Sequence, residues 1–508
     1  MTCEGHQLGS GSGFDLMKKL ALLLLSLLPA AAGADERPNI LFIFCDDHAT
    51  QAISAYGHEP KLNSTPNIDS IAEGGMLFRR CLVTNSICAP SRAVVLTGQY
   101  SHVNGQMTNK DTFDGSQQTA PKLLQAAGYQ TAIVGKWHLK SEPTGFDHFE
   151  VLKGQGQYYN PAFRTKDGII QHEGYTTDII TERALDWLKT ERDPDKPFLL
   201  MCQHKAPHGR WEPAIRHLEL FDEIEIPEPA SLFDDYAGRS KAPTQHAMGI
   251  ADHMGEARLM FKYSSKHTPE QLLAFDAYFK PRNEAFLEAN LQGDARTKWH
   301  YQRYIKNYLR CVQAVDEGVG DLLAYLDDAD LADNTVVIYM SDQGFYLGEH
   351  GWFDKRWMYE ESLRTPLLVR WPGVTPEGTV QDEYIVSNLD IAETWLEIAG
   401  AEIPEDMHGR SLVPLFSGET VEDWRSDFYY HYYEAGGHGV PLHFGVTDGT
   451  NKLIRFIGDD LDATEFYDLD RDPNEMRSEF TNPEYAGRVR ELEDRIKHHQ
   501  QLLGIQRE

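Results

Sequence analysis

Short apolar runs alternate along this chain with segments of helical periodicity. Residues 39–45 are apolar at nearly every position, as expected of a strand that is buried on both faces. Helical patterns separate the apolar runs, including a long one over residues 297–326. Strands that alternate with helices predict an α/β fold with a large parallel or mixed sheet, covered by helices on both faces. The further predicted strands are residues 131–134, 198–202, 335–340 and 366–370.

The pattern changes after about residue 420. Short alternating runs at residues 428–433, 443–448 and 452–456 indicate antiparallel strands, and a charged amphipathic helix is expected over residues 483–503. We therefore expect a large domain over residues 35–420 and a small α+β subdomain over residues 421–508. Residues 212–294 have weak periodicity, so we expect an elaborated loop region near the site.

The N-terminal segment has the pattern of a secretory signal. Met17-Lys18-Lys19 precedes an apolar run over residues 20–28, and Ala32-Gly33-Ala34 provides small residues for cleavage before Asp35. The run is too short to span a bilayer, and no second run of membrane length follows. We interpret residues 1–34 as a leader with its natural start at Met17, and expect a secreted or periplasmic product without a membrane span.

Composition narrows the classes of function. The 508 residues include 48 Lys and Arg against 78 Asp and Glu, a formal charge of −30. This balance argues against nucleic-acid binding, which needs a basic face. An anionic substrate would have to be held by local cations. Six cysteines do not form a dense disulfide framework, although one pair is possible.

Polar residues follow four of the predicted strands at the point where each ends. In open α/β sheets, ligands bind beyond the carboxyl ends of the strands, so we expect a site at this edge. The four groups are Asp46-Asp47, Gly135-Lys136-Trp137-His138, Gln203-His204-Lys205-Ala206-Pro207-His208 and Ser341-Asp342-Gln343-Gly344.

Four of these residues offer only oxygen ligands. Asp46, Asp47, Asp342 and Gln343 suit a hard divalent cation, Ca²⁺ or Mg²⁺. The alternative interpretation is structural: the acidic pair would cap a helix and Asp342 would belong to a turn.

Cys88-Ala89-Pro90-Ser91-Arg92 predicts a turn followed by a short helix that ends at Gly98. The N–H groups at a helix N-terminus favour an anion, and Arg92 lies one helical turn beyond Cys88. The segment therefore indicates a reactive centre beside an anion site. The alternative is a buried cysteine with a packing role.

Together these motifs resemble the type I, formylglycine-dependent sulfatases. The resemblance extends from about residue 38 to the C-terminus, and it implies an alkaline-phosphatase-like α/β fold: a large mixed sheet flanked by helices, with a small C-terminal α+β subdomain. The motifs that carry it are Cys88-x-Pro-Ser-Arg92, Leu96-Thr97-Gly98, Asp46-Asp47, Gly135-Lys136-Trp137-His138, Pro207-His208, Ser341-Asp342-x-Gly344 and Lys355.

The resemblance also implies a mechanism. A formylglycine-generating enzyme would oxidise Cys88 to formylglycine, whose hydrate attacks sulfur with one hydroxyl and releases sulfate through the other. Asp46, Asp47, Asp342, Gln343 and the modified Cys88 match the Ca²⁺ ligands, with Mg²⁺ also possible. Gln343 departs from the commoner Asn or His but keeps an amide oxygen.

The remaining roles follow from the same motifs. Arg92 matches the residue that holds the formylglycine hydrate. Lys136, His208 and Lys355 match the groups around the sulfate oxygens, and His208 is the expected general acid for the leaving sugar oxygen. His138 matches the base that helps to release sulfate. Either histidine could instead be structural, and the sequence leaves open whether His102, His204, Lys205, His438 and His443 take part.

Three further segments, residues 81–87, 154–161 and 352–362, resemble bacterial N-acetylglucosamine-6-sulfatases. Asp354 and Arg356 flank Lys355 and are expected to bind sugar hydroxyls, unless they only pair with each other.

The resulting prediction is an exported, exo-acting sulfatase that removes the 6-O-sulfate of N-acetylglucosamine from glycans such as mucin, keratan sulfate or heparan sulfate. The alternatives are another glycan or aryl sulfatase, a phosphoesterase, or a non-catalytic binder of sulfated glycans.

Overall fold

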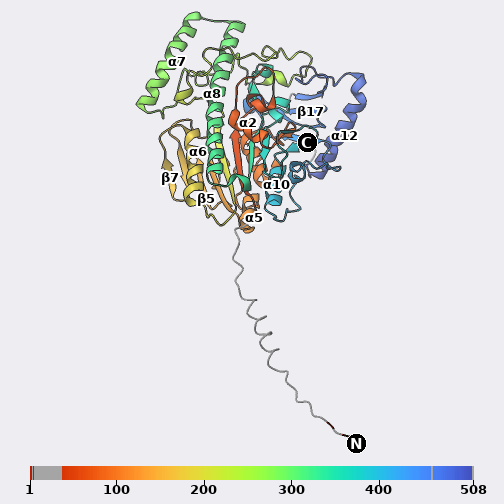
Figure 1. The fold of residues 1–508 in the computed structure, drawn as a ribbon. Helices are drawn as coiled ribbons and strands as arrows, with labels where there is room; N and C mark the ends of the chain where they lie inside the picture. The colour runs from red at the N-terminus through yellow and green to blue at the C-terminus, as the bar shows by residue number, and fades with distance from the viewer. Residues whose placement is uncertain (3, 5–36, 459–460, 506–508) are drawn as a thin grey trace. The chain divides into compact units, whose positions relative to one another are not determined.

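Strand β1 (Asn39–Asp46) lies in the middle of a large mixed sheet (Figure 1). The computed structural model describes residues 1–2, 4, 37–458 and 461–505, so the expected signal sequence lies almost wholly outside the described residues. Within them the sheet has ten strands in the order β13-β2-β12-β9-β1-β8-β4-β5-β6-β7. These are β1, β2 (Met76–Phe78), β4 (Gln130–Gly135), β5 (His148–Leu152), β6 (Ala162–Thr165), β7 (Gly168–Gln171), β8 (Phe198–Pro207), β9 (Thr335–Ser341), β12 (Leu367–Arg370) and β13 (Thr379–Gln381).

All five strands predicted from apolar runs are present in this sheet. β1, β4, β8 and β9 run parallel, whereas β12 runs antiparallel to β9, which makes the sheet mixed. Alternate residues of β1 point to different cores: Leu41 and Ile43 belong to one hydrophobic cluster, Phe42 and Phe44 to the other. The near-continuous apolar character of β1 therefore reflects burial on both faces.

Helices cover both faces of the sheet. Helices α2 (Pro66–Glu73), α6 (Thr176–Asp186) and α8 (Gly293–Asp328) pack on one side (Figure 1). Helices α3 (Cys88–Thr97), α5 (Ala120–Ala126) and α10 (Asp390–Ile398) contact one another on the other. The α/β class predicted from the sequence is confirmed.

A separate four-stranded antiparallel sheet follows near the C-terminus, in the order β15-β16-β17-β18 within the described residues. Helix α12 (Ala486–Leu502) packs on its strands β16 and β17. This confirms the small C-terminal sheet, while the domain boundary near residue 420 stays a prediction. The strands are β15 (Phe428–Tyr432), β16 (Leu442–Thr447), β17 (Asn451–Gly458) and β18 (Leu461–Asp468).

The expectation of a loop throughout residues 212–294 is wrong in part, because helix α7 (Pro269–Ala289) occupies 21 residues of it. Only four of its side chains are buried, so no continuous apolar stripe marks it in the sequence. The sequence does contain a signal for the start of α7, the capping box of Thr268 and Gln271. Thr268 accepts a hydrogen bond from the Gln271 backbone, and the Gln271 side chain accepts one from the Thr268 backbone.

The register of the parallel strands brings four chain segments to one edge of the sheet. Cys45 of β1 pairs with Ser341 of β9, Asp46 pairs with Pro207 of β8, and Gly135 of β4 pairs with Gln203 of β8. The residues that follow these positions therefore emerge side by side.

Two further expectations concern cysteines and membranes. The five cysteines of the described residues, Cys45, Cys81, Cys88, Cys202 and Cys311, are all free and buried, so no disulfide forms among them. None of the helices in the described ranges combines the length and the apolar character that a membrane span requires.

Gly135 supports a stability prediction. Its φ is +106°, and an added Cβ would collide with the backbone carbonyl of Gln203 on β8. Gly135→Ala should lower the free energy of unfolding by about 2–5 kcal/mol through backbone strain and the clash. Gly168→Ala is the matched control, because Gly168 has a φ of +130° but open space around it. It should cost only about 1–2 kcal/mol. Thermal and denaturant unfolding measure the difference, and equal losses would contradict the close approach of β4 and β8.

Candidate active site

Three carboxylates gather where β1 and β9 end. Asp46, Asp47 and Asp342 are fully or almost fully buried, and one carboxylate oxygen from each lies within 4.8 Å of the others. Asp47 has a left-handed backbone with a φ of +68°, which turns the chain directly after β1. The buried oxygens Asp46 Oδ1 and Gln343 Oε1 have no hydrogen-bond partner. Orphaned oxygens beside clustered carboxylates are the donor set that a hard divalent cation requires, so the four predicted ligands fit a metal.

Each of the three carboxylates has its own cation. Lys136, which follows β4, forms an ion pair with Asp46. The Lys355 ammonium donates to Asp47 Oδ1 at 2.5 Å. Arg92, on α3, donates to Asp342 Oδ2 through Nε at 3.1 Å and through Nη2 at 3.0 Å.

Arg92 is held in place by more than its carboxylate. Its Nη1 donates to the Lys136 carbonyl at 3.0 Å and to Gln203 Oε1 at 2.7 Å. The guanidinium therefore binds residues that emerge from β4, β8 and β9 at once, and it lies one helical turn from Cys88 as the sequence predicts.

Burial shifts the pKa of these charged groups. It raises the pKa of Asp47 to about 7, although Lys355 opposes the shift. Burial alone would lower the pKa of Lys355, but the negative groups around it, Asp47 foremost, together outweigh burial and raise that pKa. Burial holds the pKa of Lys136 well below its usual value. A bound divalent cation would favour the ionised form of Asp47.

Cys88 is the first residue of α3, which ends at Gly98 with a φ of +64°, as predicted. The thiol is 1% exposed, and its sulfur lies within 4.8 Å of an Asp46 oxygen and a His208 ring nitrogen. Burial raises the pKa of this thiol to about 12, so it stays protonated. The N–H of Ala89 donates to Asn109 Oδ1 at 3.0 Å, which fixes the start of the helix.

Two histidines flank this cluster. His208 Nδ1 lies 2.6 Å from the Gly209 carbonyl, and His208 Nε2 lies 3.9 Å from Asp47 Oδ2. Burial holds the pKa of His208 well below its usual value, so the ring donates through Nδ1 and presents Nε2 as an acceptor. His138 has a φ of +56° and a buried Nδ1 without a hydrogen-bond partner. Burial holds its pKa far below the usual value as well.

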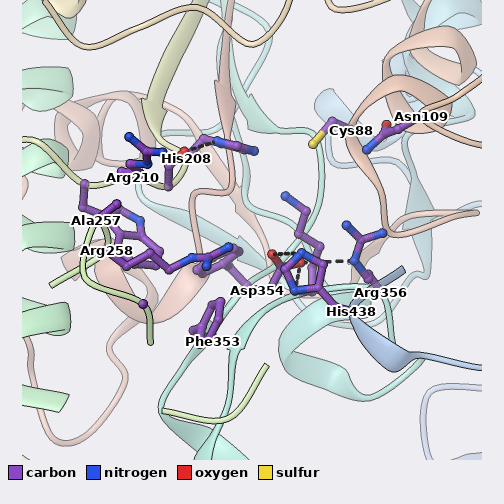
Figure 2. Close-up of a pocket in the computed structure, with 15 residues that line it drawn as sticks. Cys88, Asn109, His208, Arg210, Ala257, Arg258, Phe353, Asp354, Arg356 and His438 are labelled. Carbon is purple, nitrogen blue, oxygen red and sulfur yellow. Dashed lines mark hydrogen bonds and ion pairs between the residues drawn. The ribbon is translucent and has the colours of Figure 1, made fainter. Parts of the chain in front are cut away.

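Cys88 lines a cavity of about 380 Å³ (Figure 2). Lys355 and its two neighbours reach it from the segment that begins at β11 (Phe353–Asp354). Fifteen of the described residues line it: Cys88, Asn109, His208, Gly209, Arg210, Trp211, Gly255, Ala257, Arg258, Phe345, Phe353, Asp354, Lys355, Arg356 and His438.

Asp354 and Arg356 both line the cavity and pair with each other. Arg356 Nε lies 3.4 Å from Asp354 Oδ1, and His438 Nε2 lies 3.6 Å from Asp354 Oδ2. Burial alone would raise the pKa of Asp354, but His438, Lys355 and Arg356 hold it far below its usual value. Arg356 Nη1 also donates to the Tyr432 hydroxyl at 3.1 Å and lies 3.5 Å from Glu434 Oε1. Both sequence interpretations of the pair are thus compatible with its geometry.

The structure separates the histidines that the sequence left open. His438 lies on the cavity wall (Figure 2), whereas His443 is fully buried, and its ring stacks on Trp357 and Tyr430. His102 bonds to the Leu503 carbonyl at 3.0 Å, away from the cavity. His204 and Lys205 lie within β8 and are buried, with the Lys205 ammonium over the Tyr158 ring.

Sequence reasoning missed four residues of the site: Asn109, Arg210, Arg258 and Glu434. Arg210 lies two positions after His208, a signal that was available. The other three come from loops far from any motif, so only the fold brings Asn109 and Arg258 to the cavity and Glu434 beside Arg356. Residues 255–258 do place part of the expected loop region at the site.

Comparisons with known proteins agree with this geometry. Residues 38–401 match the sulfatase family, and residues 348–502 match the C-terminal region of the N-sulphoglucosamine sulphohydrolase family. The chain is 45% identical over 499 residues to N-acetylglucosamine-6-O-sulfatase of Bacteroides thetaiotaomicron, covering 94% of this chain and 88% of the relative. It is 28% identical over 450 residues to human N-acetylglucosamine-6-sulfatase, covering 82% of this chain and 72% of that protein.

A solved structure is similar over nearly the same length. That protein was solved in complex with its substrate, D-glucosamine-2-N,6-O-disulfate, and its structure superposes on this chain with a TM-score of 0.89 at 44% sequence identity. The match covers 92% of this chain and 98% of the solved one. The predicted alkaline-phosphatase-like fold and the family resemblance are thereby confirmed: the chain belongs to the sulfatase family and is a sulfuric ester hydrolase.

Proposed function

We propose that this enzyme removes the 6-O-sulfate of N-acetylglucosamine, with Cys88 converted to formylglycine as the nucleophile. The observation that carries the proposal is the position of Cys88 at the cavity, beside three carboxylate–cation pairs. The similar protein from Bacteroides thetaiotaomicron is named for this activity, and the substrate in the similar solved complex also carries a 6-O-sulfate.

The residues fit both groups that the family implies. Asp46, Asp47, Asp342 and Gln343 would hold a divalent cation, Ca²⁺ or Mg²⁺, which would supply positive charge to a sulfate oxygen and to the nucleophile. Formylglycine at position 88 would supply a hydroxyl nucleophile that can release sulfate afterwards. The unmodified thiol would be a poor substitute, because its pKa of about 12 leaves almost no thiolate at neutral pH.

The chain's own cations act on the sulfate. Lys355 and His208 line the cavity beside Cys88, and Lys136 lies behind them with its charge paired to Asp46. Fixed positive groups in a buried site stabilise the negative charge that grows on the sulfate and leaving oxygens. The free His208 ring is neutral with Nε2 as an acceptor, so it would first take up a proton, which the negative charge of a bound sulfate ester favours. It would then protonate the leaving sugar oxygen through Nε2, and His138 would accept a proton when sulfate is released. Arg92 would hold the nucleophile through its contact with Asp342.

The sugar would bind on the other side of the cavity. Asp354 is ionised and can accept hydrogen bonds from two ring hydroxyls, while Arg356 and His438 can donate to them. Tyr432 and Glu434 fix the Arg356 side chain in advance, which lowers the entropic cost of binding the sugar.

We also propose that the product is exported through the leader in residues 1–34 and matured by a formylglycine-generating enzyme. The leader pattern and the Cys88-x-Pro-Ser-Arg92 motif support these proposals.

The first prediction concerns the nucleophile. Enzyme that is co-expressed with a formylglycine-generating enzyme and supplied with Ca²⁺ should release sulfate from N-acetylglucosamine-6-sulfate. Cys88→Ala should reduce the rate by about 10³-fold or more, because the nucleophile is lost. Ion chromatography of sulfate measures the rate, and mass spectrometry of the Cys88 peptide shows the aldehyde.

Two controls make this result decisive. N-acetylglucosamine-6-phosphate should not be hydrolysed at a comparable rate, and comparable hydrolysis would favour a phosphoesterase. An unmodified thiol in protein from the native host would favour a glycan binder. Aldehyde without sulfate release from this sugar would overturn the 6-O assignment while leaving a sulfatase.

The second prediction concerns the metal. Ca²⁺ should raise the melting temperature of chelator-treated protein by about 3 °C, because it binds only the folded state. Asp342→Asn should reduce that shift to less than about 1 °C, because it removes a charged ligand. Scanning fluorimetry measures both values without any activity assay.

Asp316→Asn is the matched control for the metal test. Asp316 is a buried carboxylate on α8 that accepts from the Ile68 backbone at 2.9 Å, away from the cavity. The control should melt at a lower temperature but keep the full Ca²⁺ shift. A full shift in Asp342→Asn would refute this ligand.

The third prediction concerns Asp354. Asp354→Asn should lower kcat/KM for N-acetylglucosamine-6-sulfate by about 10–100-fold, since charged hydrogen bonds to the sugar are lost. It should lower kcat/KM for an aryl sulfate, which lacks these hydroxyls, by less than about threefold. Asp167→Asn, an exposed position at the β6–β7 turn, is the control. Equal losses on both substrates would mean that Asp354 acts on the sulfate side of the site.

A further inference from the structure

The cavity is basic although the chain is strongly acidic. The formal charge of the chain is −30. The residues that line the cavity nevertheless include Arg210, Arg258, Lys355 and Arg356, and Asp354 is the one acidic residue among them. This charge is more than the capture of one sulfate ester requires, so part of it is available for another anion.

Two of the four cations are already engaged. Lys355 pairs with Asp47, and Arg356 pairs with Asp354 and Glu434. The side chains of Arg210 and Arg258, in contrast, make no hydrogen bond or ion pair within the described part of the chain. Arg210 is exposed, so water can solvate its charge, whereas Arg258 is half-buried. Cations that lose water are normally paired, so the unpaired Arg258 guanidinium on the cavity wall indicates a ligand with complementary charge.

Arg258 is half-buried and held in a fixed position. Its guanidinium lies over the Phe353 ring, 4.8 Å from the ring centroid. Burial lowers its pKa, as expected for a cation that loses water without full compensation. Stacking on an aromatic ring leaves the N–H groups at the edge of the guanidinium free to donate.

The two arginines lie on the side of the cavity opposite Arg356 and His438 (Figure 2). A glucosamine ring held through its 6-sulfate has the hydroxyls of C3 and C4 along one side. If Asp354, Arg356 and His438 bind that side, C1 faces the opposite wall, and the substituent on C2, which lies across the ring from C5, points away from the 6-sulfate.

We propose that Arg210 and Arg258 form a second anion subsite, which makes the enzyme selective for 6-sulfated glucosamine units with a further negative charge. That charge is a sulfate on the C2 nitrogen, or a carboxylate on the sugar linked at C1. The inference rests on the proposed function. The similar solved complex holds a substrate with an N-sulfate, so a doubly charged ligand of this class exists for a relative.

The test is a binding measurement by calorimetry on Cys88→Ala protein with Ca²⁺, which avoids turnover. The ligands are N-acetylglucosamine-6-sulfate, N-sulfoglucosamine-6-sulfate, and N-acetylglucosamine-6-sulfate linked through C1 to a uronic acid. At least one doubly charged ligand should bind about five- to tenfold more tightly than the singly charged one, as one partly exposed charged contact provides. Which one does so identifies the source of the charge, and added salt should reduce the preference.

Arg258→Gln and Arg210→Gln, each in the Cys88→Ala background, should reduce the preference to less than about twofold. Arg455→Gln should retain it, because Arg455 lies on β17 and pairs with the exposed Asp462. Melting temperatures verify that each variant is folded.

The remaining outcomes would overturn the inference. Equal affinity for all three ligands would refute the second subsite and leave the proposed function standing. An equal loss for all ligands in Arg258→Gln would assign this arginine to the 6-sulfate. No binding of any 6-sulfated ligand would overturn the proposed function and the inference with it.

Discussion

Three buried carboxylates within 4.8 Å of one another require compensating positive charge, and the rest of the site is arranged around this requirement. Lys136, Lys355 and Arg92 supply one cation for each carboxylate. The cations come from three different segments, so the balance of charge also fixes α3 and the segment after β11 against the sheet. Removing one partner of such a buried pair typically costs about 3–5 kcal/mol. In the proposed holoenzyme, a divalent cation would leave the cluster with a positive excess that a sulfate ester can neutralise.

The parts of the fold that were predictable are those that depend on local pattern. The central strands are buried on both faces, so β1, β4, β8 and β9 stand out as apolar runs. The polar residues that follow these strands meet at one edge of the sheet because the strands are parallel and in register, which is a general property of such sheets. The carboxylates at positions 46, 47 and 342 could therefore be grouped from the amino-acid sequence alone.

The remaining parts depend on contacts between distant segments. Nothing in the sequence distinguishes His438 from His443, yet one lies on the cavity wall and the other beneath Trp357. Arg258 lies in a region with no periodic signal and reaches the site only because Phe353 supports its guanidinium. Helix α7 is largely solvent-exposed, so the apolar stripe that normally reveals a helix is missing.

The residues around the cavity come from two parts of the chain that differ in the family regions they match. Cys88, the three carboxylates and two of their cations belong to the part of the chain that matches the sulfatase family alone, ahead of residue 348. The wall with Asp354, Arg356 and His438 lies in residues 348–502, the part that matches a second family region. Lys355 is the exception, because it lies in this second part of the chain but forms an ion pair with Asp47 of the first part. Substitutions in the wall that we propose binds the sugar can therefore leave the charge cluster intact, provided that position 355 keeps its positive charge.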